Sequence, residues 1–392
     1  MALHDPAVCI VGAGPAGLAV AHLLGQAGIS SVVLERQEPD RLRGRVKAGM
    51  IEYRTVEMLK AHDLAGPILE GGRQVGMCEF RADGEAFVLD YAARCGGRCH
   101  TIYPQHELVA DWAEQLVENG GDIRFGVNAT GVEQNGERVV VRSVTQSTGE
   151  EVAIACEVAV CADGAASAFT EGVESVSLSH PFMWLTLIAA MPPSTQRTIY
   201  GLHRRGFAGQ MLRSPTLTRF VLAVPLGEAY EEWPDDRIWD ELATRLAADG
   251  RPPLLRGELV ERDILDHRVR VCTPMQHGRL FFAGDAAHLI TPAGGKGMNM
   301  ALQDAVELAT GLVDRFGKQD GRRLARYSET RLPHVWRHQE FSNLMLTLFN
   351  SGAGDAAGAG FSYSLRRARL DLLVNDPQFS RWFAHAYVGV DD

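Results

Sequence analysis

A chain of 392 residues is long enough for two or three domains around a large core. Its apolar content of 46% and charged content of 22% are typical of an ordinary globular protein. The formal net charge of −10 argues against nucleic acid or an anionic membrane surface as a partner.

The sequence carries no pattern of a membrane helix, a secretory leader or a metal site. No run reaches the roughly 20 apolar residues that a membrane helix needs, and residues 1–6 lack a basic segment. The seven cysteines are scattered, and only Cys95 and Cys99 are spaced like half of a zinc site. We therefore expect a cytoplasmic protein with reduced thiols, no membrane contact and no metal.

The first strong signal is a glycine motif near the N-terminus. The apolar residues 8–11 predict a strand, and Gly12, Gly14 and Gly17 follow it before a helical pattern. Such glycines make a tight turn, let a pyrophosphate approach the backbone and let the helix pack on the strand. Glu35 ends the next predicted strand, where a carboxylate can bond a ribose hydroxyl. The motif predicts a Rossmann-type dinucleotide site without distinguishing FAD from NAD(P).

A basic segment follows, with four arginines and a lysine at Arg36, Arg41, Arg43, Arg45 and Lys47. A solvated surface would explain these charges, but their place beside a dinucleotide fold favours an anion site.

The remaining elements alternate between strands and helices. Helices are predicted over 50–59, 106–119, 236–248 and about 298–316, and most of 322–383 is helical. Strands are predicted over 75–89, 122–126, 138–144, 153–161, 184–191, 198–203, 219–226 and 279–285. Residues 352–357 match a second dinucleotide motif formally, but they follow a helical pattern, so we interpret them as a loop.

Three motifs occur in a fixed order: the glycine turn with Glu35, then Asp163-Gly164, then Gly284-Asp285. Together with the segment 274–299, they resemble the class A flavoprotein aromatic hydroxylases, of the 4-hydroxybenzoate 3-monooxygenase type, over nearly the whole chain. The resemblance implies an FAD-dependent monooxygenase that uses NADPH or NADH and O₂, acts on a small aromatic acid and forms a homodimer.

The resemblance also implies a domain organisation. We expect an α/β, Rossmann-type FAD-binding domain over 1–74, 100–178 and 268–320. An α+β insertion over 75–99 and 179–267 forms a substrate-binding β-sheet domain. Residues 321–392 form a helical C-terminal interface region.

By the same resemblance, Gly284 and Asp285 hold the ribityl and phosphate part of FAD, the loop before the helix at 298 lines the flavin, and Pro292 lies over the substrate. The expected FAD residues are Gly12, Gly14, Gly17, Glu35, Arg36, Arg45, Gln105, Asp163, Gly284, Asp285, Gly294, Lys296, Gly297, Met298 and Asn299. His288 would support this loop structurally. The expected NAD(P)H residues are Arg36, Arg41, Arg45, Lys47 and Arg268, and the cation at Arg41 favours NADPH.

For the substrate, the resemblance assigns Tyr200 and Tyr387 to a relay that deprotonates a phenol, and Arg213 to the substrate carboxylate. Met211 and Val221 replace two polar residues that hold the carboxylate in the family. Gln74 replaces a histidine that relays the proton, and an amide cannot titrate. We therefore expect a substituted substrate such as 3-amino-4-hydroxybenzoate.

Other functions remain open from the sequence. The protein could be a 4-hydroxybenzoate 3-monooxygenase itself, or a non-catalytic homologue that binds flavin or a ligand. A halogenase is disfavoured because the Trp-x-Trp-x-Ile-Pro signature is absent. A plain NAD-dependent dehydrogenase would have no use for the glycine loop at Gly294.

Overall fold

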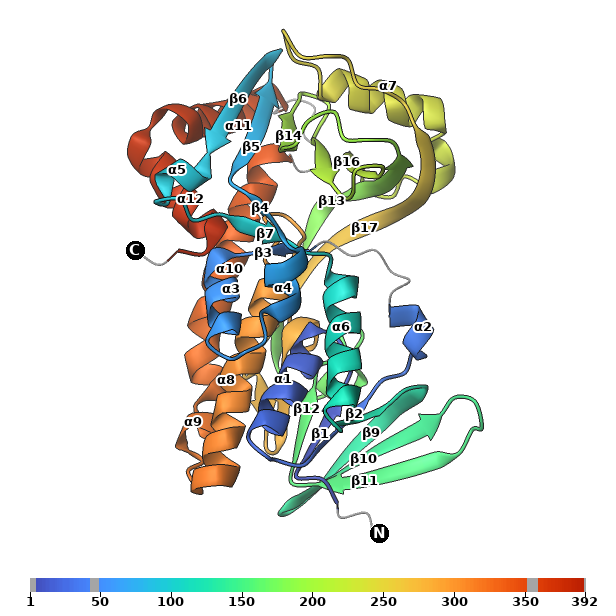
Figure 1. Cartoon of the computed structure of the whole chain (residues 1–392). Helices are drawn as coiled ribbons and strands as arrows, with labels where there is room; N and C mark the ends of the chain where they lie inside the picture. The colour runs from blue at the N-terminus through green and yellow to red at the C-terminus, as the bar shows by residue number, and fades with distance from the viewer. Residues whose placement is uncertain (1–4, 43–48, 351–358, 391–392) are drawn as a thin grey trace. The chain divides into compact units, whose positions relative to one another are not determined.

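A computed structural model describes residues 5–42, 49–350 and 359–390 (Figure 1). The chain forms two compact units. Unit 1 comprises Met1–Arg73, Thr101–Ser177 and Val269–Glu340, and unit 2 comprises Gln74–His100, Leu178–Arg268 and Phe341–Asp392. The segment 321–392, expected as a separate region, is divided between these units inside helix α10 (Tyr327–Phe349).

Unit 1 is built on a six-stranded sheet that is parallel except at one edge. Its order is β18 (Gln276–His277), β19 (Leu280–Phe282), β12 (Val158–Cys161), β1 (Val8–Val11), β2 (Ser31–Leu34) and β8 (Asp122–Arg124). All four residues of β1 are buried, as expected for a parallel strand covered on both faces. Helix α1 (Pro15–Gln26) connects β1 to its parallel neighbour β2.

Further helices and strands complete unit 1. They are α2 (Pro39–Leu42), α3 (Tyr53–Lys60), α4 (Gly66–Gly71), α6 (Gln105–Glu118), α8 (Gly297–Lys318), α9 (Arg322–Ala325), β3 (Met50–Ile51), β7 (His100–Ile102), β20 (His288–Leu289), η1 (Ala168–Thr170) and η3 (Gly284–Ala286). A three-stranded antiparallel sheet has the order β11 (Glu151–Cys156), β10 (Arg138–Thr145) and β9 (Val127–Asn135).

Three expectations for unit 1 were inaccurate in detail. Met50 is not helical: it lies in β3 and pairs with Ile102, so the helix begins at Tyr53. The apolar run 153–161 contains two strands, which separate at Glu157. Strand β9 was missed because its side chains are mostly polar and partly exposed, so it lacks an apolar pattern.

Unit 2 contains most of an eight-stranded, largely antiparallel sheet with one parallel pair. The order is β20, β17 (Glu258–Cys272), β13 (Ser175–Ala190), β16 (Thr218–Pro225), β15 (Ala208–Leu212), β14 (Thr198–Leu202), β5 (Met77–Ala82) and β6 (Glu85–Asp90). The other elements are β4 (Arg73–Val75), α5 (Tyr91–Arg94), η2 (Tyr230–Glu232), α7 (Asp235–Arg245), α11 (Ala359–Asn375) and α12 (Pro377–Val388). Strand β17 was not anticipated, because charged residues interrupt its apolar positions.

The sheet of unit 2 has two chemically different faces. One face packs against α7 in an apolar cluster that includes Leu185, Leu187, Ile199, Phe220, Leu222, Trp233, Ile238, Trp239 and Leu242. Tyr200 pairs with Phe80 on β5 and with Gly209 on β15, and Gly209 pairs with Val221 on β16. Because directly paired residues point to the same side, Tyr200, Phe80 and Val221 share the face opposite to α7.

The expected α/β fold class is confirmed. No helix in the described ranges combines the length and apolar character needed to cross a bilayer. All seven cysteines are free thiols, six of them buried and Cys99 half-buried.

Candidate active site

The glycines of the turn after β1 have two different roles. Gly12 has φ +100°, and a Cβ atom built on it would lie 2.5 Å from the carbonyl oxygen of Ala162. A Cβ on Gly17 would lie 2.0 Å from the carbonyl oxygen of Gly12. By contrast, a Cβ on Gly14 would meet nothing closer than 3.9 Å. Gly12 and Gly17 therefore serve the fold, whereas the space beside Gly14, at the N-terminus of α1, is open, as the expected pyrophosphate site requires.

This difference gives a prediction for Gly14→Ala. Gly14 has φ −77°, a conformation that alanine adopts, so the fold and the melting temperature of the FAD-free protein should be unchanged. The new methyl group occupies the space for the pyrophosphate, so FAD affinity should fall by about tenfold or more. FAD titration followed by flavin fluorescence measures it.

The matched control is Gly25→Ala in the same helix, where a Cβ meets nothing within 4 Å. This substitution should leave FAD affinity unchanged and stabilise the helix by up to about 1 kcal/mol. Equal FAD affinity in both variants would contradict the assignment of Gly14.

Two carboxylates follow the neighbouring strands. Glu35 is buried, and its carboxylate accepts hydrogen bonds from the backbone N–H of Ala13 (2.8 Å) and of Gln37 (2.9 Å). Asp163 follows β12, and its Oδ1 is buried with no hydrogen-bond partner among the described residues. Burial raises the pKa of Asp163, and Ser167, Arg36 and Arg270 oppose that rise. An unpaired buried acceptor at this edge fits a hydroxyl group of a dinucleotide.

The Gly284-Asp285 turn is held from behind by a buried ionic network. Asp304 Oδ2 accepts from Gly284 N (3.0 Å) and lies 2.5 Å from His288 Nε2, while Arg331 Nε donates to Asp304 Oδ1 (2.8 Å). Burial by itself would raise the pKa of Asp304, but His288 and Arg331 outweigh it and lower the pKa. These contacts give His288 a supporting role.

The network predicts a large stability effect for Asp304→Asn. The amide leaves the buried Arg331 without its ionic partner, so the free energy of unfolding should fall by about 3 kcal/mol. Denaturant unfolding of the FAD-bound protein measures this. Asp314→Asn on the same helix removes only the ion pair with the exposed Lys318 and should cost less than about 1 kcal/mol. Similar losses in both variants would refute a special role for Asp304.

Arg270 was missed by sequence reasoning, because no motif marks it. Its Nη1 donates to Thr170 Oγ1 (3.2 Å) and its Nη2 to the carbonyl oxygen of Ala286 (3.3 Å). One guanidinium therefore joins the segment after Asp163 to the turn that contains Asp285.

A third glycine-rich loop leads into α8. Gly294 and Gly295 have φ +79° and +67°, a region that favours glycine. Lys296 Nζ lies 2.6 Å from Glu52 Oε1, and both side chains are 1% exposed. Burial lowers the pKa of Lys296, which Glu52 partly opposes. Asn299 donates to the carbonyl oxygens of Met50 (3.0 Å) and Gly295 (2.9 Å).

The side chains of Lys296 and Asn299 are therefore engaged in contacts within the protein. What the loop offers a ligand is the backbone N–H groups and the positive dipole end of the 22-residue helix α8. Gly297 and Met298 are half-buried in its first turn, and Pro292 is exposed.

In unit 2, two buried tyrosines meet through their hydroxyl groups. Tyr200 Oη and Tyr387 Oη are 2.8 Å apart, and the residues are 7% and 1% exposed. Burial raises the pKa of Tyr200, although the hydrogen bond between it and Tyr387 opposes this; burial also raises the pKa of Tyr387. Both phenols are therefore neutral at pH 7. Phe80 and Phe349 stack on the Tyr200 ring, with centroids 5.6 and 5.4 Å away.

Tyr387 is positioned by two residues that the sequence did not reveal. His100 Nε2 lies 2.9 Å from the carbonyl oxygen of Tyr387, and the two rings are in edge contact at 4.6 Å. Tyr91 packs edge-on at 5.2 Å, and its hydroxyl donates to the carbonyl oxygen of Val75 (2.6 Å). No local pattern could have indicated these contacts, since His100 and Tyr387 are 287 residues apart.

Arginines lie further along the same sheet face. Arg219 pairs in register with Met211, and both share the side of Val221 and Tyr200 by strand alternation. Arg213 follows Met211 by two residues, and its buried Nε has no hydrogen-bond partner among the described residues. The pKa of Arg213 is lowered to about 9, mainly by burial and in addition by the neighbouring Arg219, while Glu261 opposes the shift. This desolvated cation is suited to an incoming carboxylate.

Comparisons with known proteins identify the family of the chain. A family model described as an FAD binding domain matches residues 5–342. The chain is 31% identical to p-hydroxybenzoate hydroxylase of Acinetobacter baylyi over 388 residues, which cover 98% of this chain and 95% of that protein. The chain belongs to the class A FAD-dependent aromatic hydroxylases. The expected family and the FAD cofactor are thereby confirmed.

Other relatives of this hydroxylase are more distant. The 6-methylpretetramide 4-monooxygenase of Streptomyces rimosus is 28% identical over 91% of this chain, which spans 65% of that protein. The crystal structure of p-nitrophenol 4-monooxygenase from Pseudomonas putida DLL-E4 matches with a TM-score of 0.83 at 20% identity, over 98% of both chains. That structural likeness shows the shared fold.

The other expected site residues of the hydroxylase lie in several different elements. Gln105 begins α6, Arg36, Arg41 and Asp285 are exposed, and Gln74 is exposed in β4. Arg268 belongs to unit 2 and pairs with Asp266 at 2.8 Å. Arg45 and Lys47, like the loop 352–357, lie outside the described residues. No hydrogen bond within the described part of the chain joins Gln74 to Tyr200 or Tyr387.

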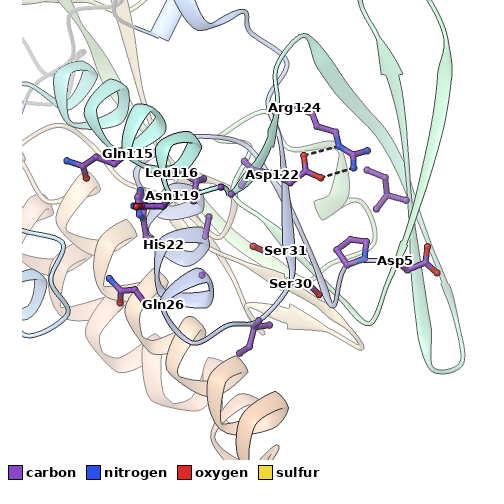
Figure 2. Close-up of a pocket in the computed structure, with 18 of the residues that line it drawn as sticks. Asp5, His22, Gln26, Ser30, Ser31, Gln115, Leu116, Asn119, Asp122 and Arg124 are labelled. Atoms are coloured by element: carbon purple, nitrogen blue, oxygen red, sulfur yellow. Dashed lines mark hydrogen bonds and ion pairs between the residues drawn. The ribbon is translucent and has the colours of Figure 1, made fainter. Parts of the chain in front are cut away.

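A large cavity of the hydroxylase lies away from these residues. It has a volume of about 900 Å³ and is lined by His22, Gln26, Ser30, Ser31, Gln115, Asn119, Asp122 and Arg124 among others (Figure 2). Ser31 and Asp122 begin β2 and β8, so the cavity lies at the amino ends of the parallel strands. Ligands of open α/β sheets bind at the carboxyl ends, where Gly12, Asp163 and Gly284 lie, so this cavity is not the FAD site.

Proposed function

We propose that this hydroxylase uses NAD(P)H and O₂ to hydroxylate a 4-hydroxybenzoate-type acid ortho to an electron-donating ring substituent. A ring-substituted acid such as 3-amino-4-hydroxybenzoate is the proposed substrate. The observation that carries the proposal is the buried Tyr200–Tyr387 hydroxyl pair on the same sheet face as Arg213 and Arg219.

The spacing along the sheet suits a para-substituted ring. Tyr200 lies in register with Gly209 on the neighbouring strand. Arg213 follows Gly209 by four residues, which corresponds to roughly 13 Å between their Cα atoms at the rise of an extended strand. The side chains of Tyr200 and Arg213 shorten that distance from both ends. A phenol at the tyrosine end and a carboxylate at the arginine end therefore match an acid with its two polar groups opposite each other.

Between these ends the face of the sheet is apolar. Val221 is 3% exposed, and the methyl group of Met211 lies 3.0 Å from where a Cβ of Gly209 would be. These two apolar side chains near Arg213 cannot give the substrate carboxylate further polar contacts. They also give the space around the substrate ring a different shape from the one that the family's polar residues would give. This supports a substrate that differs from unsubstituted 4-hydroxybenzoate.

The tyrosine pair provides the acid–base function. A neutral Tyr200 can accept the phenol proton of the substrate as it passes its own proton to Tyr387, or stabilise the resulting phenolate by donating to it. Loss of the phenol proton makes the ring more electron-rich at the ortho carbon. Phe80 and Phe349 exclude water from the Tyr200 ring and fix its orientation.

Bound FAD would accept reducing equivalents from NAD(P)H and react with O₂ to supply the transferred oxygen. Gly14, Asp163, the Gly284-Asp285 turn and the N-terminus of α8 are the groups proposed to hold it. Arg36 and Arg41 are exposed cations proposed for NAD(P)H, and the extra charge of Arg41 favours the 2′-phosphate of NADPH.

A substrate screen tests the proposal. NADPH and NADH oxidation is followed with 4-hydroxybenzoate, 3-amino-4-hydroxybenzoate and 4-aminobenzoate, and products are identified by mass spectrometry under ¹⁸O₂. We expect one labelled oxygen in the ortho-hydroxylated product and the highest kcat/KM for the substituted acid. A preference for 4-hydroxybenzoate would contradict the substrate proposal. Flavin binding without substrate-stimulated NAD(P)H oxidation would instead indicate a non-catalytic homologue.

A further inference from the structure

A charged cluster lies on the α7 side of the sheet in unit 2. Glu79 is 1% exposed, and Arg81 Nε lies 2.8 Å from its Oε1. Arg251 Nη2 and Arg197 Nη1 lie 3.2 and 3.6 Å from Oε2. Three guanidinium groups therefore surround one carboxylate, which leaves a local surplus of two positive charges.

The side chain of Arg81 makes contacts within the fold. It is buried, and besides Glu79 its Nη1 donates to the carbonyl oxygen of Leu246 at 2.5 Å. The end of α7 can approach because Gly201, in register with Arg81, has no side chain: a Cβ there would lie 2.8 Å from the carbonyl oxygen of Arg245. Arg81 therefore neutralises Glu79 and anchors the segment after α7.

Arg197 and Arg251 carry the surplus charge. Their side chains are 36% and 34% exposed, so each guanidinium reaches solvent while part of it faces Glu79. The 3.6 Å contact of Arg197 exceeds hydrogen-bond length. Within the described ranges neither arginine makes an ion pair with any carboxylate other than Glu79. Each guanidinium has five N–H donors, so most of these donors remain available.

The same face holds another surplus donor. Ile199 pairs with Glu79 on one side and Gln210 on the other, so the three residues form one row across the sheet. Gln210 is 0% exposed; its Oε1 accepts from Ser194 Oγ (2.7 Å), and its Nε2 has no partner among the described residues. The groups with unused hydrogen-bonding capacity on this face are thus Gln210 Nε2 and the two guanidinium groups, all of them donors, and what they lack is an anion.

We propose that Arg197 and Arg251 form a second, non-catalytic binding site for the phosphate group of a small molecule. Two guanidinium forks with two surplus charges match a phosphate dianion in charge and in the number of acceptor oxygens. The site is distinct from the aromatic-acid pocket, because Glu79 and Arg81 point to the opposite side of β5 from Phe80, which stacks on Tyr200. The proposed phosphate site does not depend on which aromatic acid is the substrate.

The site is tested by calorimetric titration of the FAD-bound protein with inorganic phosphate. The titration is carried out in a chloride buffer at constant ionic strength. The wild type should bind phosphate saturably. Arg197→Gln and Arg251→Gln should each weaken that binding by about tenfold, since each removes a charge-assisted contact. Arg197→Lys keeps the charge but loses the fork, and should give an intermediate affinity.

The control is Arg256→Gln, an arginine of the same unit that is 51% exposed and pairs with Asp236 and Asp240. It should bind phosphate within about twofold of the wild type. The proposal is overturned by absence of saturable binding, or by equal affinity in the wild type and in the double Arg197→Gln/Arg251→Gln variant. Acetate that displaces phosphate at equal concentration would overturn the assignment to phosphate groups.

Discussion

Replacing Tyr200 with phenylalanine should lower kcat by about a thousandfold and change the dissociation constant of the aromatic acid only a few-fold. The variant keeps the aromatic ring that stacks on Phe80 and Phe349, so the packing of the pocket is preserved. It removes only the hydroxyl that meets Tyr387 and that, in our proposal, receives the phenol proton. Positioned proton transfer typically contributes factors of this size. Stopped-flow measurement of hydroxylation, with substrate affinity from flavin absorbance, separates the two effects.

Three companion variants sharpen this test. Tyr387→Phe should cause a similar loss, and the double variant should be little worse than either single one, because the two hydroxyls act as one relay. Tyr363→Phe removes a hydroxyl that donates to Asp83 and should leave kcat unchanged. If Tyr200→Phe turned over at the wild-type rate, the tyrosine pair would have no part in the chemistry.

Arg213→Gln should weaken binding of the aromatic acid by about 300-fold and leave the protein no less stable. The loss follows from removing a charged partner of the substrate carboxylate in a desolvated site. Stability is retained because Arg213 Nε has no hydrogen-bond partner in the described structure, and burial together with Arg219 already disfavours its charge. Equilibrium titration and thermal melting without substrate measure the two quantities.

Arg213→Lys should fall between the wild type and Arg213→Gln, since an ammonium keeps the charge without the bidentate geometry. A substrate ester that lacks the carboxylate charge should bind the wild type and Arg213→Gln with similar affinity. A large drop in melting temperature for Arg213→Gln would show instead that the guanidinium supports the fold.

The sequence predicted those parts of the site that depend on local backbone geometry. Gly12, Gly14 and Gly17 could be interpreted because a tight turn and a close helix approach require glycine at fixed spacing. Tyr200, Arg213 and Tyr387 were identified through the resemblance to a family, and the structure places the hydroxyls of Tyr200 and Tyr387 2.8 Å apart.

The sequence failed where a role depends on a distant partner. Asp304, Arg270 and His100 act through contacts with residues far along the chain, and isolated charged or aromatic residues have no periodic signal. The contact of the Lys296 side chain with Glu52, 244 residues away, has no local signal either. Strand β17 was missed because charged residues on both of its faces interrupt the apolar ones, so it lacks a continuous apolar run.

The alternation of β14, β15 and β16 has a consequence for how this pocket can evolve. Neighbouring residues on these strands lie on different faces of the sheet: Met211 and Val221 lie on the face of the proposed substrate site, whereas Gln210 and Phe220 face α7. Exchanging residues at alternate positions can therefore change substrate preference without disturbing the core. Adding or deleting a single residue would turn every following side chain to the wrong face. Selection for new substrates can thus act on residue identity at these strands, while strand length stays under strict constraint.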